Sequence, residues 1–342
     1  MEILQYVDHI IQNILGSHFP EDSITINNSF ERILGGADTE IFSFSIKITN
    51  QSNPLPLVLR LYREGAVMGV SKREFETLDQ LYNAGLSVPK PYGYADSDNK
   101  LKRPFLIMEL IVGEMLSEIF FNSKTDVEAL MLKFIQNLVN IHNVNWKDHL
   151  SILVPPDIKS DPYQVIKRFM RRPVELIEQY NINELKPLIT WLQKHLLEHP
   201  LDKIVLIHGD YHAMNVMVKE NGDLVTIDWT NIILGDRRVD IAFTIVAMGS
   251  ASDIPLKENL VKIYEEITQK KIEGIEFFMV LSVLFNLMRV YSMLFNYEIT
   301  NENDMTKATM IGEYGQYVKY FVNMIKEVTG LEFPQIEKKL EI

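Results

Sequence analysis

The most constraining feature of this chain is the dipeptide Asn221-Gly222, which separates the segments NVMVKE and DLVTID. Asn-Gly between two such segments is the strongest short-range signal for a β-hairpin, because both residues tolerate the left-handed conformations that the turn needs. Pairing outward from a two-residue turn places Asn215 opposite Asp228. Directly opposed residues share one face of the ribbon, so the sequence predicts that Asn215 and Asp228 meet at the open end of a hairpin.

An amide oxygen beside a carboxylate suits a hard cation such as Mg²⁺. Asp210 precedes Asn215 on the loop that enters the same hairpin, within the segment HGDYHAMN. Two other interpretations remain open for this segment, a zinc site that uses His208, Asp210 and His212, and a polar turn that bonds its own backbone. A zinc site needs further ligands, and the eight histidines form no H-E-x-x-H pattern.

Length and composition restrict the class of protein. A chain of 342 residues is too long for one small core and predicts two lobes. Cysteine is absent, which excludes disulfides and thiolate metal sites and fits a cytoplasmic protein. The net charge of −12 disfavours nucleic acid as a partner.

No segment predicts a membrane partner. The amino-terminal segment MEILQYVDHIIQNIL has no basic n-region, and its isoleucines recur at helical spacing, so we expect an amphipathic helix rather than a signal peptide. The longest apolar stretch, residues 277–295, contains Ser282, Asn286 and Arg289. These polar side chains favour a buried helix of a large lobe over a membrane span.

Residues 23–112 have the pattern of strands with one helix. Apolar residues alternate with polar ones in EIFSFSIKI, which predicts a half-buried strand, and LPLVLRLYR and RPFLIMELI predict further strands. In the helix SKREFETLDQLYNAG, Ser71 is the expected N-cap, Glu74 completes a capping box and Gly85 ends the helix.

From about residue 115 onward the pattern is mostly helical. Residues 126–143 are apolar on nearly all sides and predict a buried central helix, with His142 as a core residue rather than a metal ligand. Two more helices are predicted within residues 161–199. Residues 203–229 then predict strand, loop, strand, turn and strand, and helices resume at about residue 239.

The segments HGDYHAMN, IDW and GDRRVDIA resemble the catalytic loop, the metal-binding aspartate and the following helix of the aminoglycoside phosphotransferase and choline kinase-like family. The resemblance covers residues 30 to about 245. It implies an α+β, two-lobed, protein-kinase-like fold, with a small mainly antiparallel β N-terminal lobe and a larger mainly α-helical C-terminal lobe. The nucleotide-binding lobe, with its N-terminal helix, is expected at residues 1–112, and the catalytic and substrate-binding lobe at residues 113–342.

The resemblance also implies roles for residues of the loop. Asp210 matches the catalytic base that orients the acceptor hydroxyl, and Asn215 and Asp228 match the Mg²⁺ ligands. His212 matches a position that either contacts the transferred phosphoryl group or braces the loop, and both roles remain open. Two further matches are structural, because His208 is expected to pack under the loop and Asp240 to bond the loop backbone.

In the N-terminal region, Gly35 and Gly36 of LGGADT resemble the nucleotide-covering loop, where backbone amides approach phosphates. Arg60 stands where many of these kinases have lysine. Arginine keeps the positive charge and adds a bidentate fork, so function is expected to survive. Glu74 resembles the glutamate that pairs with this cation.

The segment LIMELIVGEML resembles the hinge between the lobes. There, Met108 is expected behind the adenine, and the Glu109 carbonyl and the Ile111 amide are expected to bond the edge of the base. An apolar slot with a few backbone groups is the usual design of such a cofactor pocket.

Eleven residues separate Asp228 from Asp240, which leaves no room for the activation segment of a protein kinase. The sequence therefore predicts an ATP- or GTP-dependent, Mg²⁺-requiring kinase. It moves the γ-phosphoryl group to a hydroxyl of a small molecule such as an aminoglycoside-like antibiotic, an amino alcohol or a sugar. Two alternatives are a catalytically silent nucleotide-binding protein and nucleotidyl transfer on the same fold. The sequence carries no signal for an oligomeric state.

Overall fold

The computed structural model describes residues 11–12, 14–16, 18–19, 24–33, 39–49, 51–96, 102–122, 127–149, 163–249, 256–296 and 307–340. The chain divides into two compact units. The first, called here the β unit, comprises Met1–Thr125, Asn145–Ser151 and Met214–Thr230, and the second, the helical unit, comprises Asp126–Val144, Ile152–Ala213 and Asn231–Ile342. The predicted functional division at residues 112 and 113 stays a prediction.

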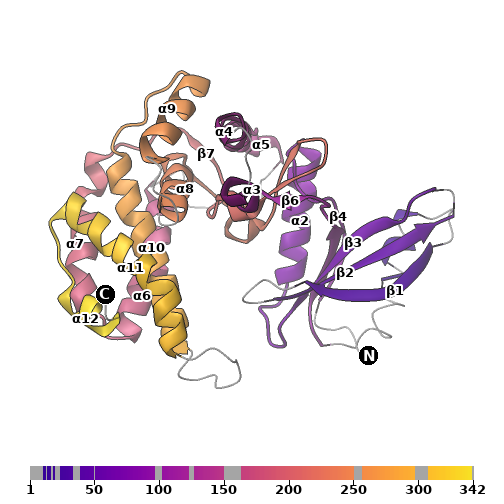
Figure 1. Cartoon of the computed structure of the whole chain (residues 1–342), viewed down its shortest axis with the longest axis horizontal. Helices are drawn as coiled ribbons and strands as arrows, with labels where there is room; N and C mark the ends of the chain where they lie inside the picture. The colour runs from indigo at the N-terminus through magenta and orange to yellow at the C-terminus, as the bar shows by residue number, and fades with distance from the viewer. Residues whose placement is uncertain are drawn as a thin grey trace. The chain divides into compact units, whose positions relative to one another are not determined.

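The β unit contains a five-stranded antiparallel sheet in the order β1-β2-β3-β5-β4 (Figure 1). Its strands are β1 (Ile24–Ile33), β2 (Thr39–Ile48), β3 (Leu55–Tyr62), β4 (Pro91–Ala95) and β5 (Phe105–Glu109). The predicted alternation of β2 is confirmed, because Phe44, Ile46 and Ile48 are all buried. In the amino-terminal segment, Ile11 and Leu15 are helical and fully buried in the same core, whereas the start of the expected helix lies outside the described residues.

The helix α2 (Val70–Asn83) packs against β4 and β5. The predicted N-cap was wrong, because the cap is Gly69, and Ser71 lies inside the helix, where its hydroxyl bonds the Ala95 carbonyl and the Asp96 carboxylate. Tertiary partners thus replace the local capping box at Ser71. The predicted end is confirmed, since the helix stops at Asn83 and Gly85 has a φ of 82°.

The predicted hairpin is present but its register was wrong by one residue. β8 (Val216–Val218) pairs with β9 (Leu224–Thr226) so that Val218 opposes Leu224, and the turn is closed by hydrogen bonds from Lys219 to Asp223 and from Gly222 to Lys219. Gly222, with a φ of 79°, is therefore the last residue of a three-residue turn. Asn215 bonds Ile227 instead of opposing Asp228.

A second, three-stranded sheet in the order β6-β8-β9 completes the β unit, with β6 at Glu114–Met115. Two short helices also belong to this unit, α3 (Leu116–Asn122) and α5 (Trp146–His149). The short 3-10 helices η4 (Ala213–Asn215) and η5 (Trp229–Asn231) lie at the points where the chain enters and leaves the hairpin.

The helical unit is built from eight helices among its described residues. They are α4 (Val127–Asn143), α6 (Gln164–Gln179), α7 (Lys186–His195), α8 (Arg238–Gly249), α9 (Leu256–Thr268), α10 (Ile275–Asn296), α11 (Lys307–Thr329) and α12 (Pro334–Leu340). The helix predicted at residues 126–143 is α4, but it is not buried on nearly all sides, because one side is exposed and Leu132 there is 51% accessible. His142 is a core residue, as predicted. The two helices predicted within residues 161–199 are α6 and α7. The strands β7 (Ile204–Ile207) and β10 (Ile233–Asp236) form an antiparallel pair that packs against α4 and α6.

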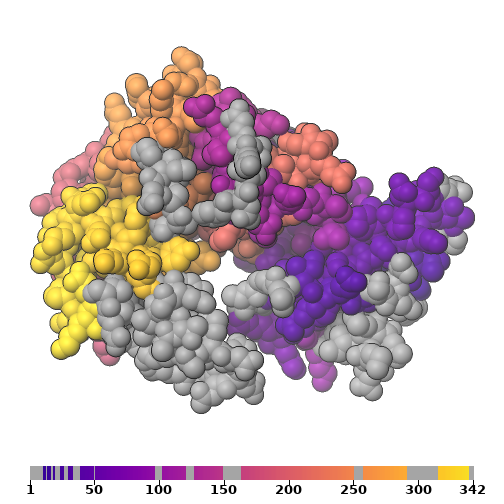
Figure 2. Space-filling view, viewed as in Figure 1, coloured from indigo at the N-terminus to yellow at the C-terminus, as the bar shows by residue number. Residues whose placement is uncertain are grey.

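The predicted buried helix is α10, which packs against α6, α8 and α11. Its residues Phe277 to Leu284 are all buried, as expected for a helix surrounded by others. Figure 2 shows α11 and α12, in yellow, at the surface of the helical unit. Within the described part of the chain, no helix has the length and hydrophobicity needed to cross a membrane.

The three-residue turn makes a prediction that a two-residue turn does not. Glu220 occupies the second position of the turn, where proline is favoured, so Glu220→Pro is expected to leave the free energy of unfolding unchanged or raise it by up to about 1 kcal/mol. Gly222→Ala is expected to lower it by about 1 kcal/mol, because alanine resists a positive φ. Denaturant unfolding measures the free energy of unfolding of both variants. A large loss of stability in Glu220→Pro would contradict the three-residue turn and favour the two-residue turn.

Candidate active site

The β unit holds a buried cluster around Arg60 of β3. The guanidinium Nη1 contacts the Glu74 carboxylate of α2 at 2.8 Å, so the predicted ion pair is confirmed. Tyr62, two residues further along β3 and so on the same face, donates its hydroxyl to the other oxygen of Glu74. The other terminal nitrogen, Nη2, lies 3.6 Å from the Asp228 carboxylate. One guanidinium thus bridges two carboxylates, which a lysine could not do with the same geometry.

The charges of this cluster depend on each other because the groups are buried. Burial alone would lower the pKa of Arg60, but Glu74 and Asp228 outweigh it and hold the pKa above its usual value. Burial raises the pKa of Glu74, and Arg60 and Tyr62 oppose that rise. Removing Arg60 would therefore leave a carboxylate in a site that stabilises its charge poorly.

Asp228 follows β9 with a φ of 59°, a left-handed conformation that is unusual for an aspartate. Its carboxylate is 40% exposed and accepts a hydrogen bond from Thr230. The carbonyl of Asn215 bonds the amide of Ile227, the neighbour of Asp228. The backbone bond therefore keeps the two expected metal ligands at the same end of the hairpin, although the ladder does not pair them directly.

The expected hinge begins at the end of β5. Met108 is half-buried, and Ile111 is buried. The Glu109 carboxylate is fixed by Lys219 at 3.3 Å and by the amide of Lys90. The contact with Lys219, which the sequence did not single out, ties the end of β5 to the hairpin. The expected glycines of the covering loop, Gly35 and Gly36, lie outside the described residues.

In the helical unit, the segment after β7 is held by Asp240 of α8, which is fully buried. Its carboxylate accepts the amides of His208 and Gly209, both at 2.8 Å, as the resemblance predicts. Gly209 has a φ of 80°, and a side chain there would collide with the backbone of Asn231. His208 is fully buried and accepts the amide of Asp210, so it packs under the loop as expected.

The next residue of the loop, Asp210, is 6% exposed and lies beside His212 and Arg289. His212 Nε2 lies 3.4 Å from one carboxylate oxygen, and Nη1 of Arg289 lies 3.4 Å from both. Burial alone would raise the pKa of Asp210, but the hydrogen bond from His212, followed by the charges of His212, Arg289 and His208, lowers it. Asp210 is therefore ionised at neutral pH.

Among the residues that the structure describes, no three or more histidine, cysteine or acidic side chains converge on a metal position. In the arrangement observed, His208 and His212 engage the loop and Asp210 rather than a common centre. The predicted Mg²⁺ ligands consist of one amide and one carboxylate, so the remaining ligands would come from phosphate and water, as is usual for this ion.

Sequence reasoning missed Tyr62 and the role of Arg289. Tyr62 was accessible from the pattern, because residues two apart on a strand share a face with Arg60. Arg289 is the one Lys or Arg residue in the apolar stretch 277–295, where it argued against a membrane span. That it reaches Asp210, 79 residues earlier, follows only from the fold.

The sequence profile described as the phosphotransferase enzyme family matches residues 30–275, which is more than two thirds of the chain. This chain belongs to the phosphotransferase enzyme family. The family assignment and the resemblance derived from HGDYHAMN agree, and a kinase-type enzyme is the class that both support.

Curated relatives with detectable similarity are much longer proteins. Acyl-CoA dehydrogenase family member 11 from Pongo abelii is 25% identical over 218 residues, which are 56% of this chain and 27% of the relative. Acyl-CoA dehydrogenase family member 10 from Mus musculus is 26% identical over 221 residues, which are 60% of this chain and 20% of the relative. The chain thus matches about a quarter of the length of these proteins.

Solved structures show the fold. A putative aminoglycoside phosphotransferase from Ralstonia eutropha JMP134 has a TM-score of 0.69 at 17% identity, covering 94% of this chain and 98% of its own. The choline kinase LicA from Streptococcus pneumoniae has a TM-score of 0.58 at 19% identity, covering 93% and 99%. The GDP complex of aminoglycoside 2'-phosphotransferase-IIIa has a TM-score of 0.55 at 14% identity, covering 94% and 98%. The predicted two-lobed, kinase-like fold is confirmed.

The Arg60 cluster predicts unequal effects of two substitutions. Arg60→Lys keeps the charge beside Glu74 and is expected to be mild, whereas Arg60→Ala leaves Glu74 buried without its cation and is expected to cost about 3–5 kcal/mol of unfolding free energy. Thermal and denaturant unfolding, with ATP·Mg²⁺ binding alongside, measure both. The control is Lys72→Ala, which removes an exposed pair on α2 and should cost less than about 0.5 kcal/mol. Equal small effects at Arg60 would contradict the assignment.

Proposed function

We propose that this protein transfers the γ-phosphoryl group of ATP or GTP to a hydroxyl group of a small molecule. The observation that carries the proposal is the position of Asp210, a buried carboxylate that His212 and Arg289 contact, on a loop whose backbone is fixed by Asp240. A carboxylate of this kind can accept the proton of an acceptor hydroxyl and orient its oxygen. Family membership supports the reaction class.

The β unit is proposed to bind the nucleotide. Arg60, held by Glu74 and Tyr62, presents a fixed positive charge to the phosphates. Met108, Glu109 and Ile111 are proposed to receive the base, and Gly35 and Gly36 to cover the phosphates. The structures of related proteins with GDP and with AMP are in keeping with a nucleotide as the donor.

The chemistry of the donor set fits Mg²⁺. Asp228 offers an exposed carboxylate and Asn215 an amide oxygen near the same end of the hairpin, and both are hard oxygen ligands. When bound, the ion would neutralise charge on the terminal phosphates. The chain's own contribution is to hold Asp228, which Arg60 and Thr230 contact.

His212 is proposed to assist Asp210. Its Nε2 contact keeps the carboxylate in one orientation, and the imidazole would also face developing negative charge on the phosphoryl group. The two roles differ in the effect of removing His212. Loss of a bracing residue would change the position of Asp210, whereas loss of a phosphate contact would change turnover alone.

A screen of hydroxylated small molecules tests the proposal directly. ATP and GTP are supplied in parallel with Mg²⁺, release of the nucleoside diphosphate is measured, and the mass of each product is determined. A gain of one phosphate supports the proposal, and a gain of one nucleotide establishes nucleotidyl transfer instead. If no aminoglycoside, amino alcohol, sugar or other hydroxylated compound stimulates release although the nucleotide binds, a silent nucleotide-binding protein is the better description.

Asp210→Asn keeps the shape of the side chain and removes its charge and basicity. We expect turnover to fall by roughly a hundred- to ten-thousand-fold, the usual contribution of a positioned base, with little change in ATP affinity. His212→Ala is expected to lose less. Asp228→Ala serves as the contrasting variant, since it should weaken the binding of ATP with Mg²⁺. If Asp210→Asn retains full turnover, Asp210 is not the base.

The charge of Arg289 predicts a shift in the pH profile. Because this cation helps to lower the pKa of Asp210, Arg289→Gln is expected to raise that pKa. Asp210 then becomes protonated at a higher pH, so the acidic limb of the kcat/KM profile moves upward. Lys262→Gln, at an exposed position of α9, is the control and should leave the limb in place. If the acidic limb of the kcat/KM profile does not move in Arg289→Gln, the titration that governs activity is not that of Asp210.

A further inference from the structure

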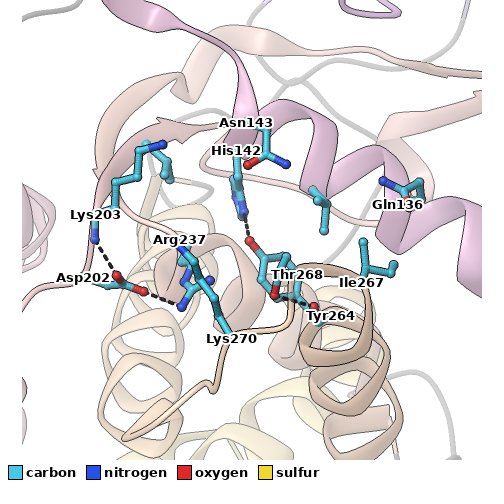
Figure 3. A pocket seen from close by; sticks show the side chains of 12 residues that line it. Gln136, His142, Asn143, Asp202, Lys203, Arg237, Tyr264, Ile267, Thr268 and Lys270 are labelled. Atoms are coloured by element: carbon cyan, nitrogen blue, oxygen red, sulfur yellow. Dashed lines mark hydrogen bonds and ion pairs between the residues drawn. The ribbon is translucent and has the colours of Figure 1, made fainter.

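The helical unit contains a cavity of about 380 Å³ that the proposed reaction does not use. It lies between the end of α4, the residues that precede β7, the segment before α8 and the end of α9 (Figure 3). Its size lies within the range of small-molecule sites. Its walls carry side-chain amides and hydroxyls as well as charges, so it suits a polar ligand.

The cavity is cationic on a strongly acidic protein. Lys203, Lys270 and Arg237 line it together with one carboxylate, Asp202, which pairs with Arg237. Within the described part of the chain, neither Lys203 nor Lys270 has an ion-pair partner. Two positive charges therefore remain uncompensated at the cavity, although the chain carries a net charge of −12. This excess favours a ligand with two negative charges.

Arg237 lines the cavity and is only 7% exposed. Its Nη2 contacts Asp202 and the carbonyl of Lys271, but its buried Nε has no hydrogen-bond partner among the described residues. A buried donor without a partner is costly, and an acceptor that draws the guanidinium toward the cavity would satisfy it. Phosphate matches this requirement, because its oxygens fit the fork of an arginine. We propose that the cavity binds a small anion that carries a phosphate group.

A chain of contacts leads from Arg237 to the catalytic loop. Arg237 lies over the ring of Tyr264, 5.8 Å from its centre. The Tyr264 hydroxyl meets His142 Nδ1 at 2.7 Å, and His142 Nε2 meets Asp240 at 3.2 Å. Figure 3 shows the Tyr264 hydroxyl directed at His142. Asp240 is the residue that holds the amides of the catalytic loop.

The direction of these hydrogen bonds follows from the chemistry of the groups. Burial raises the pKa of Tyr264 to about 12, against the opposing charge of Arg237, so its hydroxyl is protonated and donates to Nδ1. With Nδ1 as the acceptor, Nε2 donates to the carboxylate of Asp240. A ligand that changes the position of Arg237 moves Tyr264 and alters this chain. Occupancy of the cavity is therefore expected to change turnover, an effect that rests on the proposed function.

The binding site is tested without any assay of activity. Calorimetric titration with inorganic phosphate and with glycerol phosphate compares the parent protein with the double variant Lys203→Ala/Lys270→Ala. Both lysines are exposed, so the variant is expected to fold, and its affinity should fall by about tenfold or more because two charge-assisted contacts are lost. Lys262→Ala, on α9 outside the cavity, is the control. Equal affinity in the double variant, or no binding of either probe in the millimolar range, overturns the proposal.

The two probes also distinguish the sources of the phosphate group. Tighter binding of glycerol phosphate indicates a phosphorylated metabolite, whereas equal or weaker binding indicates free phosphate.

The connection between the cavity and the catalytic loop is tested with Tyr264→Phe, which keeps the ring and removes the donor to His142. This variant is expected to keep the binding that depends on Lys203 and Lys270, while a change of about fivefold in turnover on adding the probe is lost. If the probe changes turnover equally in both proteins, the chain through Tyr264 is not the route. If phosphate binds with the expected lysine dependence but no acceptor is ever phosphorylated, the site stands and the proposed function fails.

Discussion

The arrangement of the helical unit depends on one buried carboxylate, that of Asp240. A carboxylate buried away from water is strongly unfavourable unless donors surround it, and Asp240 receives the amides of His208 and Gly209 and the imidazole of His142. These donors come from two other segments, the loop after β7 and the end of α4. The same interaction that stabilises the charge therefore fixes the backbone immediately before Asp210. The positive φ of Gly209 gives the chain the turn that this requires.

In the β unit, the buried charge that organises its surroundings is a cation, the guanidinium of Arg60. Arg60 is buried between Glu74 and Asp228, and Tyr62 occupies the second oxygen of Glu74. Because the hydrogen-bond partners of Glu74 among the described residues, Arg60 and Tyr62, both come from β3, the position of α2 and the direction of the guanidinium are set together. The substitution of arginine for the lysine of many related kinases is thus compatible with the site, since the fork reaches a second carboxylate that a single ammonium group could not hold in the same way.

The sequence predicted most of what local patterns determine and failed where distant residues decide. Alternation identified β2, the apolar run of residues 126–143 identified α4, and the family motif located Asp210 and Asp240. The hairpin register was wrong because Asn221-Gly222 fits a two-residue turn and a three-residue turn equally well, and only the backbone shows that Gly222 alone takes the left-handed position. The predicted N-cap at Ser71 was wrong for a related reason, because its hydroxyl bonds Ala95 and Asp96, which are distant in the sequence.

The environment of Asp210 shows why the neighbours of a residue matter as much as its motif. A carboxylate whose pKa is lowered is fully ionised at neutral pH but is also a weaker base. Phosphoryl transfer through a loose transition state needs little removal of the proton before the bond to phosphorus forms. In the proposed reaction, the value of Asp210 then lies in a fixed, charged acceptor that orients the hydroxyl, and its basicity is secondary. His212 and Arg289 serve that purpose because they keep the carboxylate ionised inside a buried site, where burial alone would have raised its pKa.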